Sequence, residues 1–256
     1  MRIFALPAAL LLGAALYTNL PQAREALPAA LRALLAKIRQ LFTSKKGKTD
    51  DRSARAVYFL ILAAAATLLC AVHPIAAALV MAPLFSGFAA LPAAAKAKQE
   101  LDSGAHSKDI PGYERRVLES CAPLGDAFAL HVSAPLLLCA LGMALHVGGA
   151  LGWLYAGLIA VREEIPAAER ILRPVKKAGD GAFTALLLLC SGLVGRNPLR
   201  VGGSGAGEKL MHALSLQGEI DHAPISGDIT QAIFLCLMST GLVCGLATLA
   251  GFLLLR

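Results

Sequence analysis

Long apolar runs alternate with charged segments along this chain, and the runs are long enough to cross a membrane. The first run is Ile3 to Leu20, and a 40-residue uncharged stretch from Ala56 to Ala95 follows a basic segment. One helix crosses a bilayer with about 20 mostly apolar residues. The uncharged stretch is therefore predicted to form two helices, Ala56 to Val72 and Ile75 to Ala95, joined by a tight turn at His73-Pro74.

The second half of the chain repeats this pattern. Residues 127–161 are predicted to form another apolar hairpin, which bends near Gly148-Gly149. Residues 182–194 are apolar for only 13 positions, which is short for a crossing and favours a re-entrant or interfacial piece. The last predicted crossing runs from Gln231 to Leu255, and Asp228 has capping-box spacing to Gln231 at its start.

A basic segment separates the first two apolar runs. Between Gln22 and Phe42, leucines recur at helical spacing and basic residues occupy much of the other face, which predicts an amphipathic helix along the lipid headgroups. The same helix could instead recruit a partner protein. Residues 21–55 hold nine of the 24 Lys and Arg residues, so we place them in the cytoplasm with the N-terminus outside. The polar loops 96–126 and 162–181 then face the cytoplasm too, and the loop 196–230 joins them if residues 182–194 do not cross the membrane.

These patterns predict an all-α fold, a polytopic integral membrane helical bundle of about five to six apolar helices with an N-terminal amphipathic interfacial helix. Its parts are a membrane anchor (1–20), the basic amphipathic helix with its linker (21–55) and a polytopic domain (56–256). A signal peptide resembles the first part, but Leu20-Pro21-Gln22-Ala23 is a poor cleavage site, which favours a retained anchor.

Composition supports a membrane protein and narrows its partners. The chain is 57% hydrophobic and 16% charged, with a mean hydropathy of +0.64, which excludes a soluble or disordered protein. Six of the seven net positive charges reside in residues 21–55, so anionic lipid headgroups are the expected partner and no nucleic-acid binding is expected. The six cysteines form neither a disulfide framework nor a zinc-binding pattern, and no metal site is predicted from them.

Several further motifs carry weaker predictions. Residues 202–207 are rich in glycine, but Glu208-Lys209-Leu210 follows where a phosphate-binding loop needs Lys and then Ser or Thr. His131 and His146 are ionisable groups within an apolar hairpin. Two glycine pairs with GxxxG spacing allow close helix packing inside the bundle or a homodimer; they are Gly148 with Gly152 and Gly241 with Gly245.

The order of motifs from residue 74 to about 250 resembles the CobD/CbiB family, the membrane enzymes of cobalamin biosynthesis that make adenosylcobinamide phosphate. The family's cytoplasmic helix, its Asp and its Ala-Pro-Leu are similar to Leu118-Glu119-Ser120, Asp126 and Ala134-Pro135-Leu136. A later family segment is similar to Gly205 through Ala213. The resemblance implies a location in the bacterial cytoplasmic (inner) membrane.

For function, the resemblance implies an ATP-dependent C–N ligase that joins aminopropanol phosphate to the corrinoid adenosylcobyrate. Such chemistry needs carboxylates to hold Mg²⁺ with the nucleotide, and cations on the phosphates. The implied catalytic residues are Glu119, Asp126 and Glu208. The implied substrate- and phosphate-binding residues are Ser120, Lys177 and Lys209.

The chain departs from the family where the Arg-Ala-x-Asn-Thr-x-Asp signature should fall. Residues 153–160 are only apolar or glycine there, and the family's Pro-Ala-Arg is absent from residues 176–185. Two interpretations therefore stay open. The chain is a synthase or a degenerate paralogue of it, or it is a non-catalytic membrane interaction or signalling protein similar to the AmpE type, which lacks the same signature.

Overall fold

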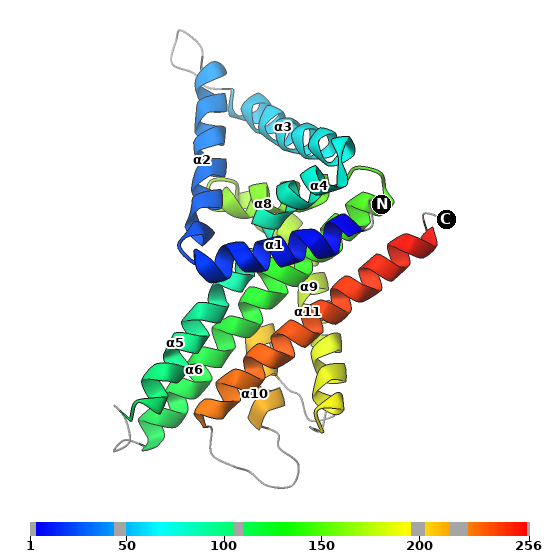
Figure 1. Cartoon of the computed structure of the whole chain (residues 1–256). Helices are drawn as coiled ribbons and strands as arrows, with labels where there is room; N and C mark the ends of the chain where they lie inside the picture. The colour runs from blue at the N-terminus through cyan, green and yellow to red at the C-terminus, as the bar shows by residue number, and fades with distance from the viewer. Residues whose placement is uncertain (1–3, 44–49, 105–109, 196–202, 216–224, 255–256) are drawn as a thin grey trace. The chain divides into compact units, whose positions relative to one another are not determined.

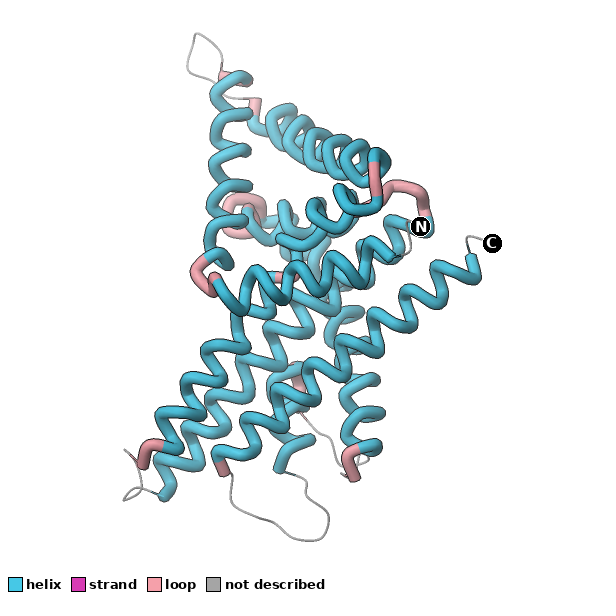
Figure 2. The backbone as a smooth tube through the Cα atoms, in the orientation of Figure 1, coloured by secondary structure: helices cyan, strands magenta, loops and turns pink. Residues whose placement is uncertain are grey.

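The computed structural model describes residues 4–43, 50–104, 110–195, 203–215 and 225–254. All regular elements in these ranges are helices, which confirms the predicted all-α class (Figure 2). The predicted linker around 45–49 lies outside the described residues, as do the polar segments 196–202 and 216–224.

Three helices are long and apolar enough to cross a membrane. They are α3 (Asp51–Val72), a continuous helix over Gly112–Ala144, and the Ser226–Phe252 part of α11 (Ser226–Leu254). A bent pair, Pro74–Leu84 with Ser86–Asp102, raises the number to four if it forms one span. Two further apolar helices, α1 (Ala5–Asn19) and α8 (Ala150–Ala160), are shorter than a crossing needs.

The surface of the spanning helices fits lipid contact. On α3, Leu60 and Leu68 are each 67% exposed and Val72 is 76% exposed. A soluble monomer rarely exposes a large contiguous apolar surface, because water contact with it is unfavourable. The chain is an integral membrane protein.

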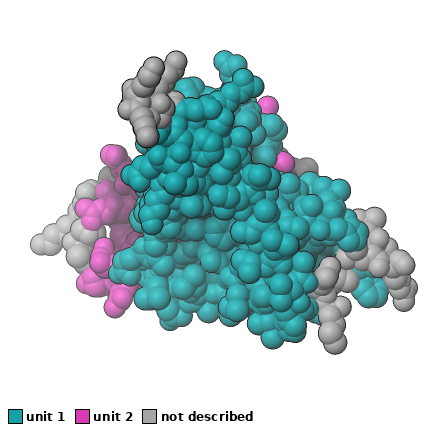
Figure 3. Space-filling model, turned by 90° about the horizontal axis from the view of Figure 1, so that it is seen from above, with its two compact units in different colours: residues 1–85, 135–175, 247–256 teal, residues 86–134, 176–246 magenta. Residues whose placement is uncertain are grey.

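The chain divides into two compact units, shown in separate colours in Figure 3. Unit 1 comprises residues 1–85, 135–175 and 247–256, and unit 2 comprises residues 86–134 and 176–246. The boundaries fall between Phe85 and Ser86, between Ala134 and Pro135, and inside the helices α9 (Pro166–Leu193) and α11. Each unit is described separately.

In unit 1, the first helix packs closely against the segment that follows the His73 turn. A Cβ on Gly13 of α1 would lie 2.7 Å from the carbonyl oxygen of Ala82, so only glycine allows this approach. Tyr17 fixes the other end, because its hydroxyl donates to the carbonyl oxygen of Pro83 at 2.7 Å. The neighbouring α4 (Pro74–Met81) lies beside α1 in Figure 1.

The basic amphipathic helix α2 (Ala23–Leu41) is present as predicted, but the protein itself covers part of its apolar face. Leu31, Leu35 and Ile38 are buried in one cluster with Tyr58 of α3 and Val161. At these three positions the side chains contact protein rather than lipid headgroups, because α3 and the turn after α8 pack against them.

Ion pairs tie α2 to the same neighbours. Arg39 Nε donates to Asp51 Oδ1 at 2.7 Å, and Arg39 Nη1 donates to Glu164. Arg55 pairs with Asp51 from the next turn of α3. One arginine of α2 therefore joins the start of α3 to the connection between α8 and α9.

The turn at His73-Pro74 is confirmed. His73 is extended (φ −156°, ψ 146°), and its Nδ1 accepts a hydrogen bond from the backbone N–H of Ile75 at the start of α4. The second arm is not one straight helix as predicted. Two 3₁₀ turns over 82–89 interrupt it before α5 (Ala90–Asp102), with a 51° bend, because Pro83 lacks the N–H that an α-helix needs.

The second predicted hairpin is also present, with a longer first arm. Helix α6 (Ile110–Phe128) continues through a π-helix, η4 (Ala129–Ser133), into α7 (Ala134–Ala144). The chain then turns with positive φ at His146 (62°) and Gly148 (56°) and enters α8. The polar segment before this hairpin is thus largely helical.

Residues 182–194 do not form a separate re-entrant piece. They belong to α9, a single helix of 28 residues that also contains most of the polar segment 162–181. Helix periodicity continues through both halves, so the change from polar to apolar composition does not mark a break. In unit 2, α10 (Ala206–Ser215) follows, and α11 begins at Ser226.

The capping interaction at α11 differs in detail from the prediction. Asp228 Oδ2 accepts from the backbone N–H of Ile225 at 3.0 Å. Asp228 therefore occupies the third helical position and reaches back to the cap, the role of the acidic residue in a capping box. The helix begins one turn earlier than the pairing of Asp228 with Gln231 predicts.

Candidate functional site

All six residues that the sequence singles out lie in unit 2, and the start of α10 brings several of them together. Asp126, near the end of α6, accepts a hydrogen bond through Oδ1 from the backbone N–H of Gly207 at 2.8 Å. This N–H belongs to the first turn of α10 and has no partner within the helix. The Asp126 carboxylate of α6 thus provides the hydrogen-bond acceptor for a backbone N–H at the start of α10.

Small residues allow this contact. A Cβ on Gly207 would collide with the carbonyl oxygen of Ala122, and one on Gly125 would lie 2.8 Å from the carbonyl oxygen of Ala206. The backbones of α6 and α10 therefore touch at two glycines. In Figure 1, α10 lies beside α6.

Glu208 is held locally. Its Oε2 accepts from the backbone N–H of Ser204 at 2.6 Å and from the Ser204 hydroxyl at 2.9 Å. These two hydrogen bonds stabilise the ionised form and lower the pKa of Glu208 below its ordinary value of 4.5. The side chain closes the loop before α10 onto the helix's first turn.

These contacts also bear on the glycine-rich loop. A bound phosphate would use the free backbone N–H groups at the start of α10. Two of the N–H groups there already donate to protein carboxylates, that of Gly207 to Asp126 and that of Ser204 to Glu208. Carboxylates of the protein, one from α6 and one from α10, therefore occupy these N–H groups, in agreement with the loop's departure from phosphate-loop spacing.

Lys209 points to α9. Its Nζ lies 3.7 Å from Asp180 Oδ2 and 3.4 Å from the Thr184 hydroxyl oxygen. The second oxygen of this carboxylate, Asp180 Oδ1, is buried and has no hydrogen-bond partner among the described residues. Lys177, one turn earlier on α9, is exposed.

Glu119 lies apart from this junction. Arg115 Nε donates to Glu119 Oε1 at 2.6 Å within α6, and both side chains are exposed. Seven residues separate Glu119 from Asp126, which along a helix is about 10 Å. Ser120 is engaged locally too, because its hydroxyl donates to the carbonyl oxygen of Arg116 at 2.7 Å.

The arrangement does not fit a magnesium–nucleotide site. Mg²⁺ needs an octahedral shell near 2 Å from its oxygens, so carboxylates that share an ion must lie close together. Within the described part of the chain, no group of three His, Cys, Asp or Glu side chains is placed to hold a metal. Asp126, Glu208 and Lys209 converge on one junction, whereas Glu119 and Lys177 are not held there.

Sequence reasoning missed Asp180, Thr184 and Ser204 as partners in this junction. The spacing of Ser204 to Glu208, four residues apart at the start of a helix, was a usable signal. Nothing local indicates that Asp180 meets Lys209, because 29 positions and a chain reversal separate them.

One of the remaining glycine pairs has a packing role. A Cβ on Gly148 would lie 2.6 Å from Cys70 Cβ, and one on Gly152 would lie 2.7 Å from Cys139 Sγ, so this GxxxG pair packs inside unit 1. A Cβ on Gly241 or Gly245 would meet no described atom within 4 Å. His131 lies in the π-helix of α6–α7.

The π-helix itself receives a neighbour. A Cβ on Gly179 of α9 would lie 2.9 Å from the carbonyl oxygen of Ala129 and 2.7 Å from Ala134 Cβ. Helix α9 therefore approaches α6–α7 closely where the backbone hydrogen bonding changes.

Comparison of the chain with protein-family models, with curated proteins and with solved structures finds no match.

Proposed function

We propose that this integral membrane protein is a degenerate paralogue of the CobD/CbiB type, located in the bacterial cytoplasmic membrane and accessory to cobalamin biosynthesis, without ligase activity of its own. One observation carries the proposal. The carboxylates that would hold Mg²⁺ and ATP serve helix ends and local pairs instead: Asp126 binds the α10 backbone, Glu208 binds Ser204 and Glu119 binds Arg115.

The apolar stretch 153–160 supports the same conclusion. In α8, this stretch packs Gly157 against Leu62 and Tyr58, where a Cβ would lie 2.6 Å and 3.2 Å from their side-chain atoms. Polar Arg, Asn, Thr and Asp side chains would have to fit into this close contact. The residues are thus specialised for packing, and catalytic groups have no room there.

The synthase remains the alternative, and one feature favours it. Asp126, Glu208 and Lys209 meet at a single helix junction. The family resemblance implies that these three residues act in one site. Rearrangement of the Ser204 loop on nucleotide binding would be required. The second alternative is a signalling protein of the AmpE type. Like the proposed degenerate paralogue it would catalyse no reaction, but it would bind a different partner.

Turnover distinguishes these functions. Purified protein in detergent is incubated with adenosylcobyrate, aminopropanol phosphate, ATP and Mg²⁺, with an active CobD/CbiB synthase in parallel. We expect no adenosylcobinamide phosphate from this chain or from Glu119→Gln. Product formation by the wild type that Glu119→Gln abolishes would overturn the proposal and establish the ligase.

The proposal also includes five to six membrane-embedded helices with residues 21–55 in the cytoplasm, beside anionic headgroups. Because all six native cysteines are buried, single cysteines introduced at Gln22 and Ser103 can be labelled over a low background. We expect a membrane-impermeant maleimide to label both in inverted vesicles and neither in intact spheroplasts. Labelling of the two positions from opposite sides would contradict this topology.

A further inference from the structure

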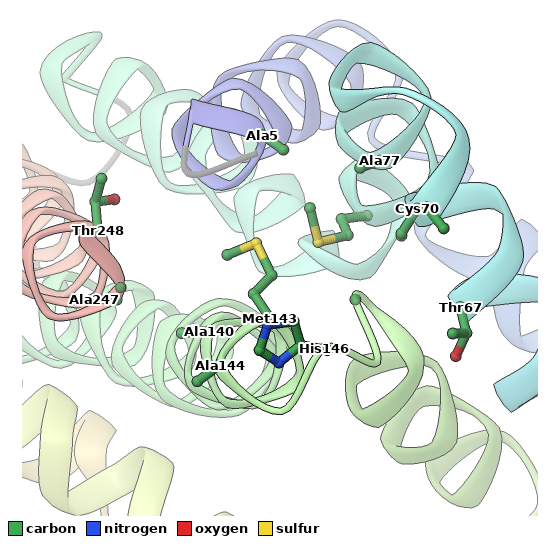
Figure 4. Close-up of a pocket in the computed structure, with 14 residues that line it drawn as sticks. Ala5, Thr67, Cys70, Ala77, Ala140, Met143, Ala144, His146, Ala247 and Thr248 are labelled. Carbon is green, nitrogen blue, oxygen red and sulfur yellow. The ribbon is translucent and has the colours of Figure 1, made fainter. Parts of the chain in front are cut away.

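Unit 1 contains a cavity of about 160 Å³ whose polar lining is unusually rich in sulfur (Figure 4). Most of its wall is alanine and glycine. The exceptions with soft donor atoms are Cys70 on α3, Met81 at the end of α4, Met143 on α7 and His146 in the turn after α7. Figure 4 shows the Met143 side chain extending from α7 into this space.

Two of the sulfur atoms, Cys70 Sγ and Met81 Sδ, lie next to Gly149. Cys70 Sγ accepts from the backbone N–H of Gly149 at 3.4 Å. A Cβ built on Gly149 would lie 3.5 Å from Cys70 Sγ and 3.6 Å from Met81 Sδ, so the two sulfurs are at most about 7 Å apart. A methionine has three flexible torsions, which let its sulfur move over this range.

His146 is held in a strained conformation at the same place. Its φ is +62°, and among the residues that the structure describes it is the one non-glycine residue with a positive φ. The left-handed region is unfavourable for an L-residue, because its Cβ comes too close to the following carbonyl oxygen, and glycine would avoid this strain. Such strain persists where a side chain is needed, and it clusters at functional sites.

Two hydroxyl groups also lie in the wall, those of Thr67 and Thr248, and oxygen donors are less suited to Cu(I) than sulfur donors are. Thr67 Oγ1 donates to the carbonyl oxygen of Ala63 at 2.8 Å and lies 3.3 Å from that of Val147. The donors that remain around Cys70 are one thiol, two thioethers and one imidazole. Thiolate and thioether ligands select Cu(I) over the hard cations Mg²⁺ and Ca²⁺, which prefer oxygen.

We propose that this cavity is a Cu(I) site, with Cys70 as thiolate and Met81, Met143 and His146 as the other ligands. Binding forms the Cu–S bond and releases the Cys70 thiol proton to solvent, and the ion stays in the reduced state throughout. The ligands come from three helices and a turn, so the ion would crosslink α3, α4 and α7 within unit 1.

Competition with a chromogenic chelator tests the proposal. The full-length protein in detergent, kept reduced with ascorbate, is titrated against the Cu(I) complex of bathocuproine disulfonate. We expect each chain to take one Cu(I) from the bathocuproine complex. Cys70→Ser and Met143→Leu should each weaken binding by at least about 10-fold, which is the lower end of the effect of losing even a supporting partner.

Matched variants separate a site from general thiol affinity. Cys190→Ser and Met238→Leu make the same chemical changes in unit 2 and should leave Cu(I) binding unchanged. His146→Gly should weaken Cu(I) binding and raise the Tm, because it removes a ligand together with the backbone strain. No transfer of Cu(I) to the wild type, or equal losses in the cavity and control variants, would overturn the proposal, as would a cavity that takes up benzene but no Cu(I).

Discussion

Asp126 and Gly207 are joined by a hydrogen bond of 2.8 Å, although 81 residues separate them in sequence. The carboxylate accepts from the first turn of α10, where negative charge is favourable because of the helix dipole. Gly207 is also the point where α10 touches the backbone of α6. One residue thus provides both the donor and the space for the contact.

Replacing Gly207 by alanine should separate α10 from α6. The new Cβ would collide with the carbonyl oxygen of Ala122, and overpacking of this kind costs about 1–3 kcal/mol. Gly205→Ala is the matched control, since its Cβ would meet only Asp126 Oδ1 at an ordinary 3.6 Å. Hydrogen exchange of the 203–215 peptide should rise in the first variant alone, and equal exchange in both would contradict the packing.

Removing the Asp126 carboxylate should destabilise α10 without affecting its packing surface. The loss of a cap costs about 1 kcal/mol, so Asp126→Ala should lower the SDS concentration at which helicity is lost, whereas Asp126→Asn keeps an acceptor and should lower it less. Circular dichroism in mixed micelles provides the measurement. Glu163→Ala, an exposed acid elsewhere, should have no effect.

The contribution of Glu208 should depend on pH in a defined direction. Its hydrogen bonds to Ser204 lower its pKa in the folded state, so the stabilisation is present above the unfolded pKa and is lost as the pH falls through the folded one. The Tm of the wild type should therefore exceed that of Glu208→Gln at pH 7, and the difference should shrink below about pH 4. A constant difference down to pH 3 would show that charge plays no part.

The ion pair between Arg39 and Glu164 should show measurable coupling. Both side chains are partly exposed, at 28% and 37%, and such pairs contribute about 0.2–1 kcal/mol. A double-mutant cycle of Arg39→Ala with Glu164→Gln measures the coupling free energy of unfolding. We expect a value in this range at low salt that falls at 1 M NaCl, whereas exposed Arg24 paired with Glu164→Gln should show none.

The sequence predicts which segments are helical far better than where the helices end. Runs of apolar residues about as long as the bilayer is thick identify α3 and α11, and Pro74 identifies the turn at His73. Both signals depend only on residues close together in the sequence. The same criterion misjudges α9, whose composition changes midway although its backbone does not. It also treats residues 75–95 as one arm, and the bend there depends on Pro83 and on the packing of α1.

The candidate site shows the same limit. The resemblance assigns Asp126 and Glu208 to one functional group, and both carboxylates accept from backbone N–H groups at or just before the start of α10. Their partners do not follow from the sequence. Asp126 meets Gly207 because glycines let α6 and α10 approach. A contact between helices distant in sequence, such as that of Lys209 with Asp180, leaves no periodic signal in either helix.

The π-helix at 129–133 has a consequence for how this chain tolerates length changes. A π turn is closed by a hydrogen bond between residues five apart instead of four, so it accommodates one extra residue within an otherwise regular α-helix. In a regular α-helix, deleting one residue rotates everything beyond it by about 100°. Deleting one residue from this π turn would instead restore α geometry, so the helical segments on either side would keep their facing. The helix can therefore change its length by one residue at 129–133 and still present Ala134 to Gly179.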